Sequence, residues 1–555
     1  MSEIERESMD YDVVIVGAGP AGLSAAIRLK QLDADLSVVV LEKGSEVGAH
    51  ILSGAVLDPV ALTQLIPDWK AKGAPVTVPV REDRFHILGE GGSIRIPNWM
   101  MPPLMSNHGN YIVSMGNVCR WLATQAEELG VEIFPGMSCS ELVYGENGEV
   151  KGVVAGEFGK NPDGTPGDAY EPGMELHGKY VFLGEGVRGS LTKEVMAKYD
   201  LQKGRDPQKF GLGMKEIWEI DPEKHKEGTV VHTMGWPLGK NAGGGSFIYH
   251  LDNNQVYVGF VVHLNYENPY VYPYMEFQRF KHHPMVAELL KGGKRVAYGA
   301  RAIAEGGWQS MPKAVAPGVA ILGCGVGLAN VPRIKGNHNA MLSGIEAAEA
   351  AAKALAAGRG GDELDGYEAA VRSGPIAKDL KPVRNVKPLW SKLGLVGGVV
   401  LGGYQNVSLE MGNAVIIPAF VIVVLGGLGS FRGAVVGGLL VGIVQSAVST
   451  FVPTLQGVVI FLLMIGVLLV RPEGLFGGGA EGVNPVRSEP SEFVGGTGGG
   501  VLTGRLRFEV GLAVVAVLAL VPVFDGILYS GFVVSLLITV LIWALFAMSL
   551  DIILG

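Results

Sequence analysis

The uneven distribution of charge along this 555-residue chain constrains what it can fold into. Of its 99 charged residues, 86 precede residue 395, as do all three cysteines and all eleven histidines. The remainder contains no lysine and consists of long apolar runs separated by Gly-rich joints. Such runs are typical of membrane segments, whereas the first part has the composition of a water-soluble domain. The sequence therefore predicts two chemically different parts joined end to end.

Overall composition argues against two classes of protein. A net charge of −9 and a pI near 5.7 provide no basic surface for a polyanion, so we expect no nucleic-acid partner. The start, MSEIERESMD, lacks the basic and apolar regions of a secretory signal, which predicts a cytoplasmic location for the first part. Cys119, Cys139 and Cys324 are too few and too scattered for a disulfide framework or a four-cysteine metal site.

A nucleotide-binding motif opens the first part. The β-branched run YDVVIVG is followed by GAGPAG and by the helix-forming stretch LSAAIRLKQL. A second β run, residues 36–41, ends in Glu42, whose carboxylate can accept hydrogen bonds from ribose hydroxyls. Because strand, turn, helix, second strand and acid follow in this order, we predict a dinucleotide site with phosphates at the helix N-terminus. A purely structural glycine turn is the alternative.

The residues after Glu42 distinguish between dinucleotides. A Gly-containing loop, EKGSEVGAHILSGAVLDP, stands where an NAD dehydrogenase would continue with alternating strands and helices. Near residue 319 the chain again reads as strand, Gly-rich turn and Ala-rich helix, VAILGCGVGLANVPRIKGNHNAMLSGIEAAEAAAKAL. This second turn suits a flavin contact at a helix N-terminus. The loop after Glu42 resembles that of the large family of FAD-dependent oxidoreductases, and this resemblance implies FAD.

Residues 10 to about 403 resemble the electron transfer flavoprotein-ubiquinone oxidoreductase family, on strings such as GAHILSGAVLDP, GLGMKEIWEI, GGGSFIYHL and NVPRIKGNHNAMLSG. The resemblance implies a membrane flavoprotein with FAD and a 4Fe-4S cluster, which takes electrons from electron transfer flavoprotein and reduces ubiquinone. It also implies an α/β, Rossmann-like FAD-binding fold of the glutathione-reductase type over residues 1–404. An α+β quinone-binding region is expected to be inserted at about residues 230–310.

The resemblance also implies the binding residues. It places the ubiquinone contact at Gly244 and Gly245, where the alternative is a pair of glycines required by a bulge or hairpin. We assign no catalytic side chain, because electron transfer at a flavin needs no protein acid or base, and we interpret His250 and His263 as structural strand positions. The FAD contacts are expected at Gly17, Gly19, Ala21, Gly22, Glu42, Lys43, Gly48, Arg120, Gly323, Gly325 and Gly327.

Two apolar segments each contain a tryptophan. ILSGAVLDPVALTQLIPDWK carries Trp69, and IRIPNWMMPPLM carries Trp99. Either segment suits the bilayer interface, and ordinary core packing explains both equally well.

The cluster region of the resembled family is missing. In that family the chain continues into a region whose four cysteines hold the cluster, but here the match ends near residue 403 and no cysteine follows Cys324. A 4Fe-4S cluster is held by four cysteine thiolates that lie close together. We therefore predict FAD without a 4Fe-4S cluster and no other metal site.

The second part resembles permease subunits of branched-chain amino-acid ABC transporters. Residues 405–476 carry the strings GGLGSFRGA and RPEGLFG of one subunit's C-terminal part, residues 477–504 form a Gly-rich linker, and residues 505–555 look like the start of the partner subunit. All-α transmembrane helices are expected at 433–452, 455–470, 507–524 and 531–554. We interpret 415–428 as re-entrant or interfacial rather than spanning, because this keeps the arginines and the linker on the cytoplasmic side.

Three functions follow from these two parts. The first is an electron-transferring-flavoprotein dehydrogenase in the cell inner membrane, with a cytoplasmic FAD domain, the lipid bilayer, ubiquinone and electron transfer flavoprotein as partners. The second is a permease component that assembles with ABC transporter subunits. The third is a chimeric reading frame with neither complete activity.

The cysteine count yields a test. Protein purified from cells supplied with iron is expected to contain FAD and to lack stoichiometric iron and acid-labile sulfide, because three scattered cysteines cannot supply four ligands. Iron, sulfide and flavin are measured on the same sample. About four iron and four sulfide per chain would contradict the expectation.

Overall fold

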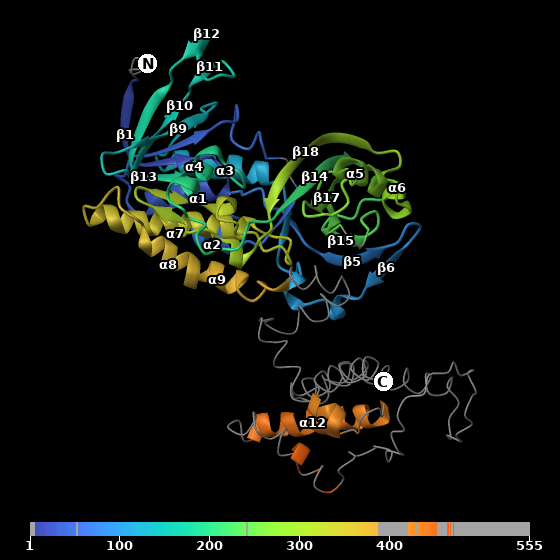
Figure 1. Ribbon diagram of the computed structural model, residues 1–555. Coiled ribbons are helices and arrows are strands. Elements are labelled where there is room, and N and C mark those ends of the chain that lie inside the picture. Colours follow the sequence, from blue (N-terminus) through green and yellow to red (C-terminus); the bar gives the residue numbers. More distant parts are fainter. Residues whose placement is uncertain are drawn as a thin grey trace. The chain divides into compact units, whose positions relative to one another are not determined.

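The computed structural model describes residues 6–51, 54–239 and 242–386 and, in the C-terminal part, 420–425, 427, 431–451, 463–465, 467 and 470. The chain divides into two compact units, Met1–Asn406 and Val407–Gly555. Figure 1 shows the elements of each unit.

An eight-stranded sheet forms the nucleotide half of the first unit. Its central strands β20, β13, β1, β2 and β8 are parallel, and β10 joins β13 in antiparallel pairing. Val13, Val14 and Ile15 of β1 are fully buried, as expected for a parallel strand covered on both faces. The strands are β1 Ser8–Val16, β2 Val38–Glu42, β8 Glu132–Pro135, β9 Cys139–Tyr144, β10 Val150–Ala155, β13 Met174–Leu183, β19 Val315–Ala316 and β20 Val319–Ile321.

Helix α1 follows β1 and is buried nearly all round. It packs against α7 and α3 (Figure 1), and the Ala-rich sequence of α7 permits a close approach. A Cβ atom built on Gly344 of α7 would lie 2.1 Å from the carbonyl oxygen of Ala21, so bare backbone is required at this crossing. The helices are α1 Pro20–Leu32, α2 Val60–Leu65, α3 Met115–Glu128, α4 Ser190–Lys198, α7 Asn337–Ala356, α8 Asp365–Ser373 and α9 Pro375–Leu380.

A seven-stranded sheet forms the other half of the first unit, in the order β18-β14-β17-β16-β15-β5-β6. All neighbours are antiparallel except β5 and β15. Helices α5 and α6 contribute Phe277, Phe280 and Val286 to the core on one face (Figure 1). The elements are β5 Glu82–Leu88, β6 Ser93–Ile96, β14 Phe210–Glu219, β15 Thr229–Gly235, β16 Gly244–His250, β17 Gln255–His263, β18 Lys294–Ala304, α5 Pro273–Lys281 and α6 Pro284–Leu290.

This sheet takes up more of the chain than the inserted region expected at about 230–310. It begins at Phe210 and takes two strands, β5 and β6, from a much earlier segment. The domain boundaries given above stay predictions.

Short elements complete the first unit, and they separate the two tryptophans. Trp69 is 4% exposed and belongs to the core, whereas Trp99 is 69% exposed. Core packing therefore explains the first segment, and only the second presents its tryptophan outward. The short elements are β3 Ala55–Leu57, β4 Val78–Pro79, β7 Tyr111–Val113, β11 Phe158–Lys160, β12 Pro166–Glu171, η1 Asn98–Met100, η2 Pro103–Met105, η3 Trp308–Ser310 and η4 Gly323–Gly325.

In the second unit the structure describes helix α12, Phe431–Phe451, and a few further residues. Val421, Ile422 and Leu425 pack with Val441 of α12. Across the described ranges, no helix combines enough length with enough apolar character to cross a membrane. The predicted span 433–452 falls on α12, and the other three lie wholly or mostly outside the described residues, so the transmembrane part of the predicted fold is not confirmed.

The crossing of α1 and α7 yields a prediction. Replacing Gly344 by alanine is expected to lower the free energy of unfolding by about 1–3 kcal/mol, because the new methyl group must displace the Ala21 carbonyl. Thermal unfolding of the full chain in detergent, followed by circular dichroism, measures the change. Gly366→Ala is the matched control, since its Cβ would meet only the Ala350 side chain at 3.7 Å. Equal midpoints for Gly344→Ala and wild type would contradict the prediction.

Candidate functional site

The turn between β1 and α1 has the geometry of a phosphate-binding loop. Gly17 has φ +104°, and its Cβ would lie 2.6 Å from the oxygen of Gly184. A Cβ on Gly22 would lie 2.1 Å from the oxygen of Gly17, whereas Gly19 faces open space. No side chain caps the start of α1, so the backbone N–H groups of its first turn, near Ala21, are available to an anion.

Glu42 ends β2 beside this turn. Its carboxylate accepts hydrogen bonds from the backbone N–H of Ala18 at 3.1 Å and of Gly44 at 2.7 Å. These two bonds fix the carboxylate and leave further lone pairs for ribose hydroxyls. The neighbouring Lys43 is exposed.

Gly48 and Arg120 lie at the rim of the same region. Gly48 has φ +84°, and its Cβ would lie 2.7 Å from the oxygen of Gly116, so the loop needs glycine there. The Arg120 side chain, from α3, contacts Glu46 at 2.9 Å and Asn117 at 3.0 Å. It is exposed and held in place by these two partners rather than directed into the core.

The second Gly-rich turn lies next to α7. The N–H of Gly323 donates to the hydroxyl of Ser343 at 2.9 Å, and Gly323 and Gly327 have φ +58° and +82°. Gly325 lies between them in the 3-10 turn η4. The turn therefore follows β20 and precedes the loop to α7, as the sequence predicts.

The N-terminus of α7 offers unsatisfied donors. Its cap, Gly336, has no side-chain hydrogen bond. The side-chain nitrogen of Asn337 is buried and has no hydrogen-bond partner among the described residues. A buried donor without a partner is costly, so this position fits a ligand that accepts hydrogen bonds.

A cavity of about 470 Å³, called here the main cavity, lies between the nucleotide half and the seven-stranded sheet. Pro20 of the first turn, Cys324 of the second turn and Asn337 line one side. Gly244 and Gly245 of β16 line the other. The structure thus brings the predicted quinone contacts to the same cavity as immediate neighbours of the predicted FAD contacts.

Neighbouring backbone also accounts for Gly244 and Gly245. A Cβ on Gly244 would lie 2.1 Å from the oxygen of Val261, and one on Gly245 would lie 2.7 Å from the oxygen of Thr233. Close strand packing therefore requires glycine at both positions, and the quinone contact stays a prediction.

Two lysines line the main cavity, and the pKa of each is lowered. The Lys215 ammonium donates to the carbonyl of Gly54 at 3.0 Å, and burial lowers its pKa to about 8. Lys335 donates to the carbonyl of Arg333 at 3.1 Å, and burial together with the charge of Arg333 lowers its pKa to about 8. Within the described ranges neither lysine has a carboxylate within ion-pair distance. The ammonium groups of both lysines can therefore interact with an anion bound in the main cavity.

Histidines of the main cavity differ in their partners. His232 shares a hydrogen bond of 2.9 Å with the hydroxyl of Tyr249, and burial, aided by Lys335, lowers its pKa to about 3. His263 is bonded through Nδ1 to Glu305. The sequence pattern did not single out Lys215 or Glu305, and it indicated a structural role for His263. The signal at Lys215 is weak, since β14, FGLGMKEIWE, also contains Glu216 and Glu219.

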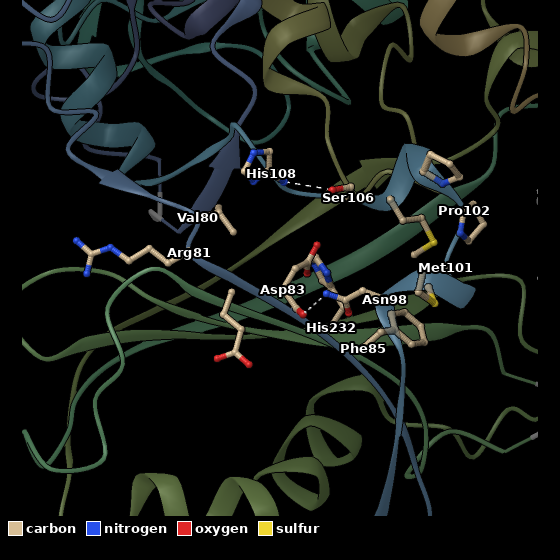
Figure 2. Close-up of a pocket in the computed structure, with 13 residues that line it drawn as sticks. Val80, Arg81, Asp83, Phe85, Asn98, Met101, Pro102, Ser106, His108 and His232 are labelled. Atoms are coloured by element: carbon tan, nitrogen blue, oxygen red, sulfur yellow. Dashed lines mark hydrogen bonds between the residues drawn. The ribbon is translucent and has the colours of Figure 1, made fainter. Parts of the chain in front are cut away.

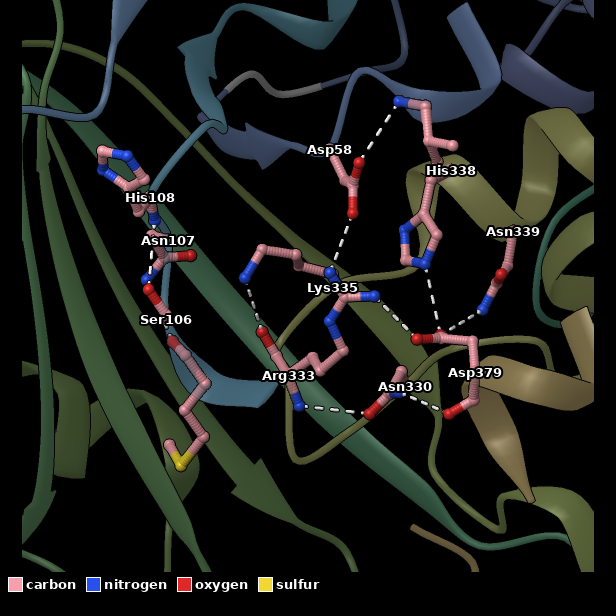
Figure 3. Close-up of polar contacts among 12 residues, drawn as sticks. Asp58, Ser106, Asn107, His108, Asn330, Arg333, Lys335, His338, Asn339 and Asp379 are labelled. Atoms are coloured by element: carbon pink, nitrogen blue, oxygen red, sulfur yellow. Dashed lines mark hydrogen bonds and ion pairs between the residues drawn. The ribbon is translucent and has the colours of Figure 1, made fainter. Parts of the chain in front are cut away.

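A polar network holds the loop before α7 (Figure 3). Arg333 pairs with Asp58 at 2.8 Å and with Asp379 at 2.6 Å, and His338 and Asn339 also contact Asp379. Burial alone would raise the pKa of Asp379, but hydrogen bonds and the charges of His338 and Arg333 hold it well below its usual range. The network fixes the segment that carries Lys335 and Asn337 into the main cavity.

A second cavity of about 210 Å³, called here the side cavity, adjoins the main cavity (Figure 2). The two share Phe85, Met105 and His232. Asp83 lies at its centre, where burial raises the pKa of the carboxyl although Asn107 donates to it at 2.8 Å. Met101, Pro102, Pro103 and Asn98 complete much of its wall.

The cysteines do not form a cluster site. Cys119 and Cys139 are separately placed in α3 and β9, burial raises both thiol pKa values to about 12, and burial also raises the pKa of Cys324. The described residues contain no group of three or more potential metal ligands. The donor set of this chain therefore does not fit a 4Fe-4S cluster.

Comparison with known proteins places these features in families. Residues 210–303 match the family described as ETF-QO, ubiquinone-binding, and residues 15–68 match the NAD(P)-binding Rossmann-like domain. Residues 394–468 match the branched-chain amino acid transport system / permease component. One solved structure, a geranylgeranyl bacteriochlorophyll reductase-like protein from Thermoplasma acidophilum, has a TM-score of 0.53 at 16% identity, covers 73% of this chain and 94% of its own, and shows the fold alone.

Curated relatives are much closer in sequence. Electron transfer flavoprotein-ubiquinone oxidoreductase of Pseudomonas aeruginosa is 55% identical over 402 residues, which are 71% of this chain and 73% of that protein. The mitochondrial protein of Rattus norvegicus is 50% identical over 413 residues, 72% of this chain and 67% of its own. The α/β part of the predicted fold and the oxidoreductase resemblance are confirmed, and the permease resemblance is confirmed for the fragment within residues 394–468. The chain belongs to the electron transfer flavoprotein-ubiquinone oxidoreductase family.

Proposed function

We propose that this protein is a FAD-dependent oxidoreductase that transfers electrons from electron transfer flavoprotein to ubiquinone at the cell inner membrane. The observation that carries the proposal is the main cavity, which joins the two Gly-rich turns of the nucleotide half to Gly244 and Gly245. The names of the curated relatives supply the donor and the acceptor.

The residues of the nucleotide half fit FAD. Backbone N–H groups at the start of α1, beside Gly19 and Ala21, would hold the diphosphate, and Glu42 would accept the ribose hydroxyls. The second turn and Asn337 would face the flavin end. Arg120, Lys43 and Gly48 would complete the rim. Bound FAD supplies a carrier that accepts and passes on electrons singly or in pairs.

Ubiquinone would occupy the part of the main cavity beside β16. A flat headgroup can lie against Gly244 and Gly245 because neither position carries a side chain. Its apolar tail would leave past Phe85 and Met105 into the side cavity. Ile94 and Trp99, both 69% exposed, lie in the segment around that cavity and suit contact with lipid.

The missing cluster limits the electron path. Because the cysteines do not fit a 4Fe-4S centre, any activity of this chain must pass electrons to the quinone without one.

A second candidate is favoured by the match of residues 394–468 to a permease component. Under it, the C-terminal part would provide transmembrane helices with the linker on the cytoplasmic side, and ABC transporter subunits would be its partners. The permease match covers residues 394–468, whereas the oxidoreductase relatives match about 70% of the chain, so we favour a role in attaching the cytoplasmic flavoprotein to the membrane. A chimeric protein without either complete activity is the remaining alternative.

The proposed FAD site is tested at Glu42. Glu42→Ala is expected to weaken FAD binding about tenfold or more, because hydrogen bonds to a charged group contribute about 1.5–3 kcal/mol each. The dissociation constant is measured by titrating FAD into the apoprotein and following flavin fluorescence. Glu127→Ala, at an exposed position of α3, is the control. Equal FAD affinity of Glu42→Ala and wild type would remove Glu42 from the site.

The proposed quinone site is tested at Val261, which lines the main cavity and pairs with Gly245 across the sheet. Val261→Phe is expected to raise KM for a short-chain ubiquinone about tenfold by filling the cavity, with FAD content unchanged. Quinone reduction is measured with reduced electron transfer flavoprotein as donor. A wild-type protein that binds FAD fully and reduces no quinone would favour the chimeric alternative. An unchanged KM in Val261→Phe would show that the quinone does not bind beside Val261.

A further inference from the structure

The main cavity contains one histidine paired with a carboxylate. His263 is the last residue of β17, and Glu305 follows the last residue of β18. Nδ1 of His263 is hydrogen-bonded to a carboxylate oxygen of Glu305, which is only 3% exposed. Both side chains line the main cavity.

The pair lies beside the proposed quinone contacts. In the pairing of β16 with β17, Gly244 is opposite Val262, and the backbone N–H of His263 donates to the carbonyl of Gly243 at 2.9 Å. A Cβ built on Gly243 would lie 2.6 Å from Cδ2 and 3.5 Å from Nε2 of the imidazole. The ring therefore covers the bare backbone where β16 begins, one residue before Gly244.

This arrangement prepares the imidazole to give up a proton. A carboxylate at Nδ1 fixes the ring orientation, as in other histidine–carboxylate pairs. Nε2 has no hydrogen-bond partner within the described ranges, so an imidazolium at this position can donate its Nε2–H to a ligand in the cavity. Histidine is the side chain best suited to proton exchange near neutral pH.

The geometry points to His263 as the catalytic proton donor to one carbonyl oxygen of the quinone, with Glu305 as the residue that positions it. The inference rests on the proposed function. Reduction of a quinone to a quinol adds two electrons, which reduced FAD would supply when bound, and two protons. At the oxygen beside His263 an O–H bond forms and the Nε2–H bond breaks. The other oxygen takes its proton from water, and water then reprotonates His263.

Other ionisable groups of the cavity are less suited to this role. His232 already uses Nε2 in its bond to Tyr249, and burial lowers its pKa to about 3. Lys215 and Lys335 keep further N–H groups after donating to the carbonyls of Gly54 and Arg333, but no carboxylate among the described residues pairs with either ammonium to fix its position. His263 alone among these four side chains has a carboxylate partner and a nitrogen left for a ligand.

The test replaces His263 by glutamine in the full chain and compares two acceptors. Short-chain ubiquinone needs protons on reduction, whereas ferricyanide takes one electron and no proton. His263→Gln is expected to lower kcat for ubiquinone about 10²-fold, the lower end for loss of a general acid, while ferricyanide reduction stays within about twofold. FAD content and the dissociation constant of ubiquinone, measured by quenching of tryptophan fluorescence, are expected to be unchanged.

Two further variants separate chemistry from structure. Imidazole added to His263→Ala is expected to restore part of the ubiquinone rate, because a small proton donor can enter the space left by the side chain. His177→Gln is the matched control, since His177 is also paired with a carboxylate, Glu175 at 2.8 Å, but lies in β13 and does not line the main cavity. It is expected to keep both rates.

The possible outcomes distinguish a failure of the proposed function from a failure of the proposed role of His263. A wild-type protein that reduces ferricyanide but never ubiquinone would defeat the proposed function. A wild-type protein that reduces ubiquinone, together with His263→Gln at the same rate, would overturn the role of His263 and leave the function standing. Equal losses with both acceptors, or no rescue by imidazole, would assign His263 a structural role instead.

Discussion

The packing of the first unit depends on close contacts between backbone atoms at the start of α1, where glycines leave no side chain in between. Gly22 lies against the carbonyl of Gly17, and Gly344 of α7 lies against the carbonyl of Ala21. These contacts bring α1 close to β1 on one side and to α7 on the other, so the helix is buried nearly all round. They also fix the direction of its uncapped N-terminus. At the proposed phosphate site, precision would come from the absence of side chains at these glycines.

The seven-stranded sheet supplies a largely apolar wall of the main cavity, with a few polar side chains. Its face toward the main cavity carries Lys215, His263 and Gly244 within a largely apolar surface. Lys215 is buried and has no carboxylate partner in the described part of the chain, and this burial disfavours its charged form, as the lowered pKa indicates. Proteins retain such groups where a ligand compensates for the lost hydration. The sheet thus combines an apolar surface for a flat ring with a few polar groups that can orient it.

Local sequence predicted the nucleotide half well. The run predicted as a strand at 12–16 lies within β1, the run at 36–41 largely matches β2, and the Ala-rich stretch after the second glycine turn forms α7. These elements depend on contacts close in sequence, where β-branched residues, glycine and alanine carry the information. The resemblance, not the residues alone, directed attention to Gly244 and Gly245.

The substrate side could not be predicted in the same way. Lys215, His263 and Glu305 come from three separated segments, and only the strand pairing shows that they face one cavity. Alternation along β16 and β17 gave no reason to distinguish His263 from His250, since both are strand positions. Long-range pairing of β-strands, and therefore the composition of a cavity between them, is not encoded in a local pattern.

The parallel pairing of β5 with β15 has a consequence for how the chain is made. Glu82 pairs with Thr229, and Leu88 pairs with Gly235, so β5 and β6 leave the ribosome long before their partner strand. Until then the hairpin of β5 and β6 has an open edge, and a two-stranded ribbon is only marginally stable in water. The seven-stranded sheet is therefore completed late in synthesis. The edge of its early hairpin stays open during that interval, and slower translation lengthens the interval.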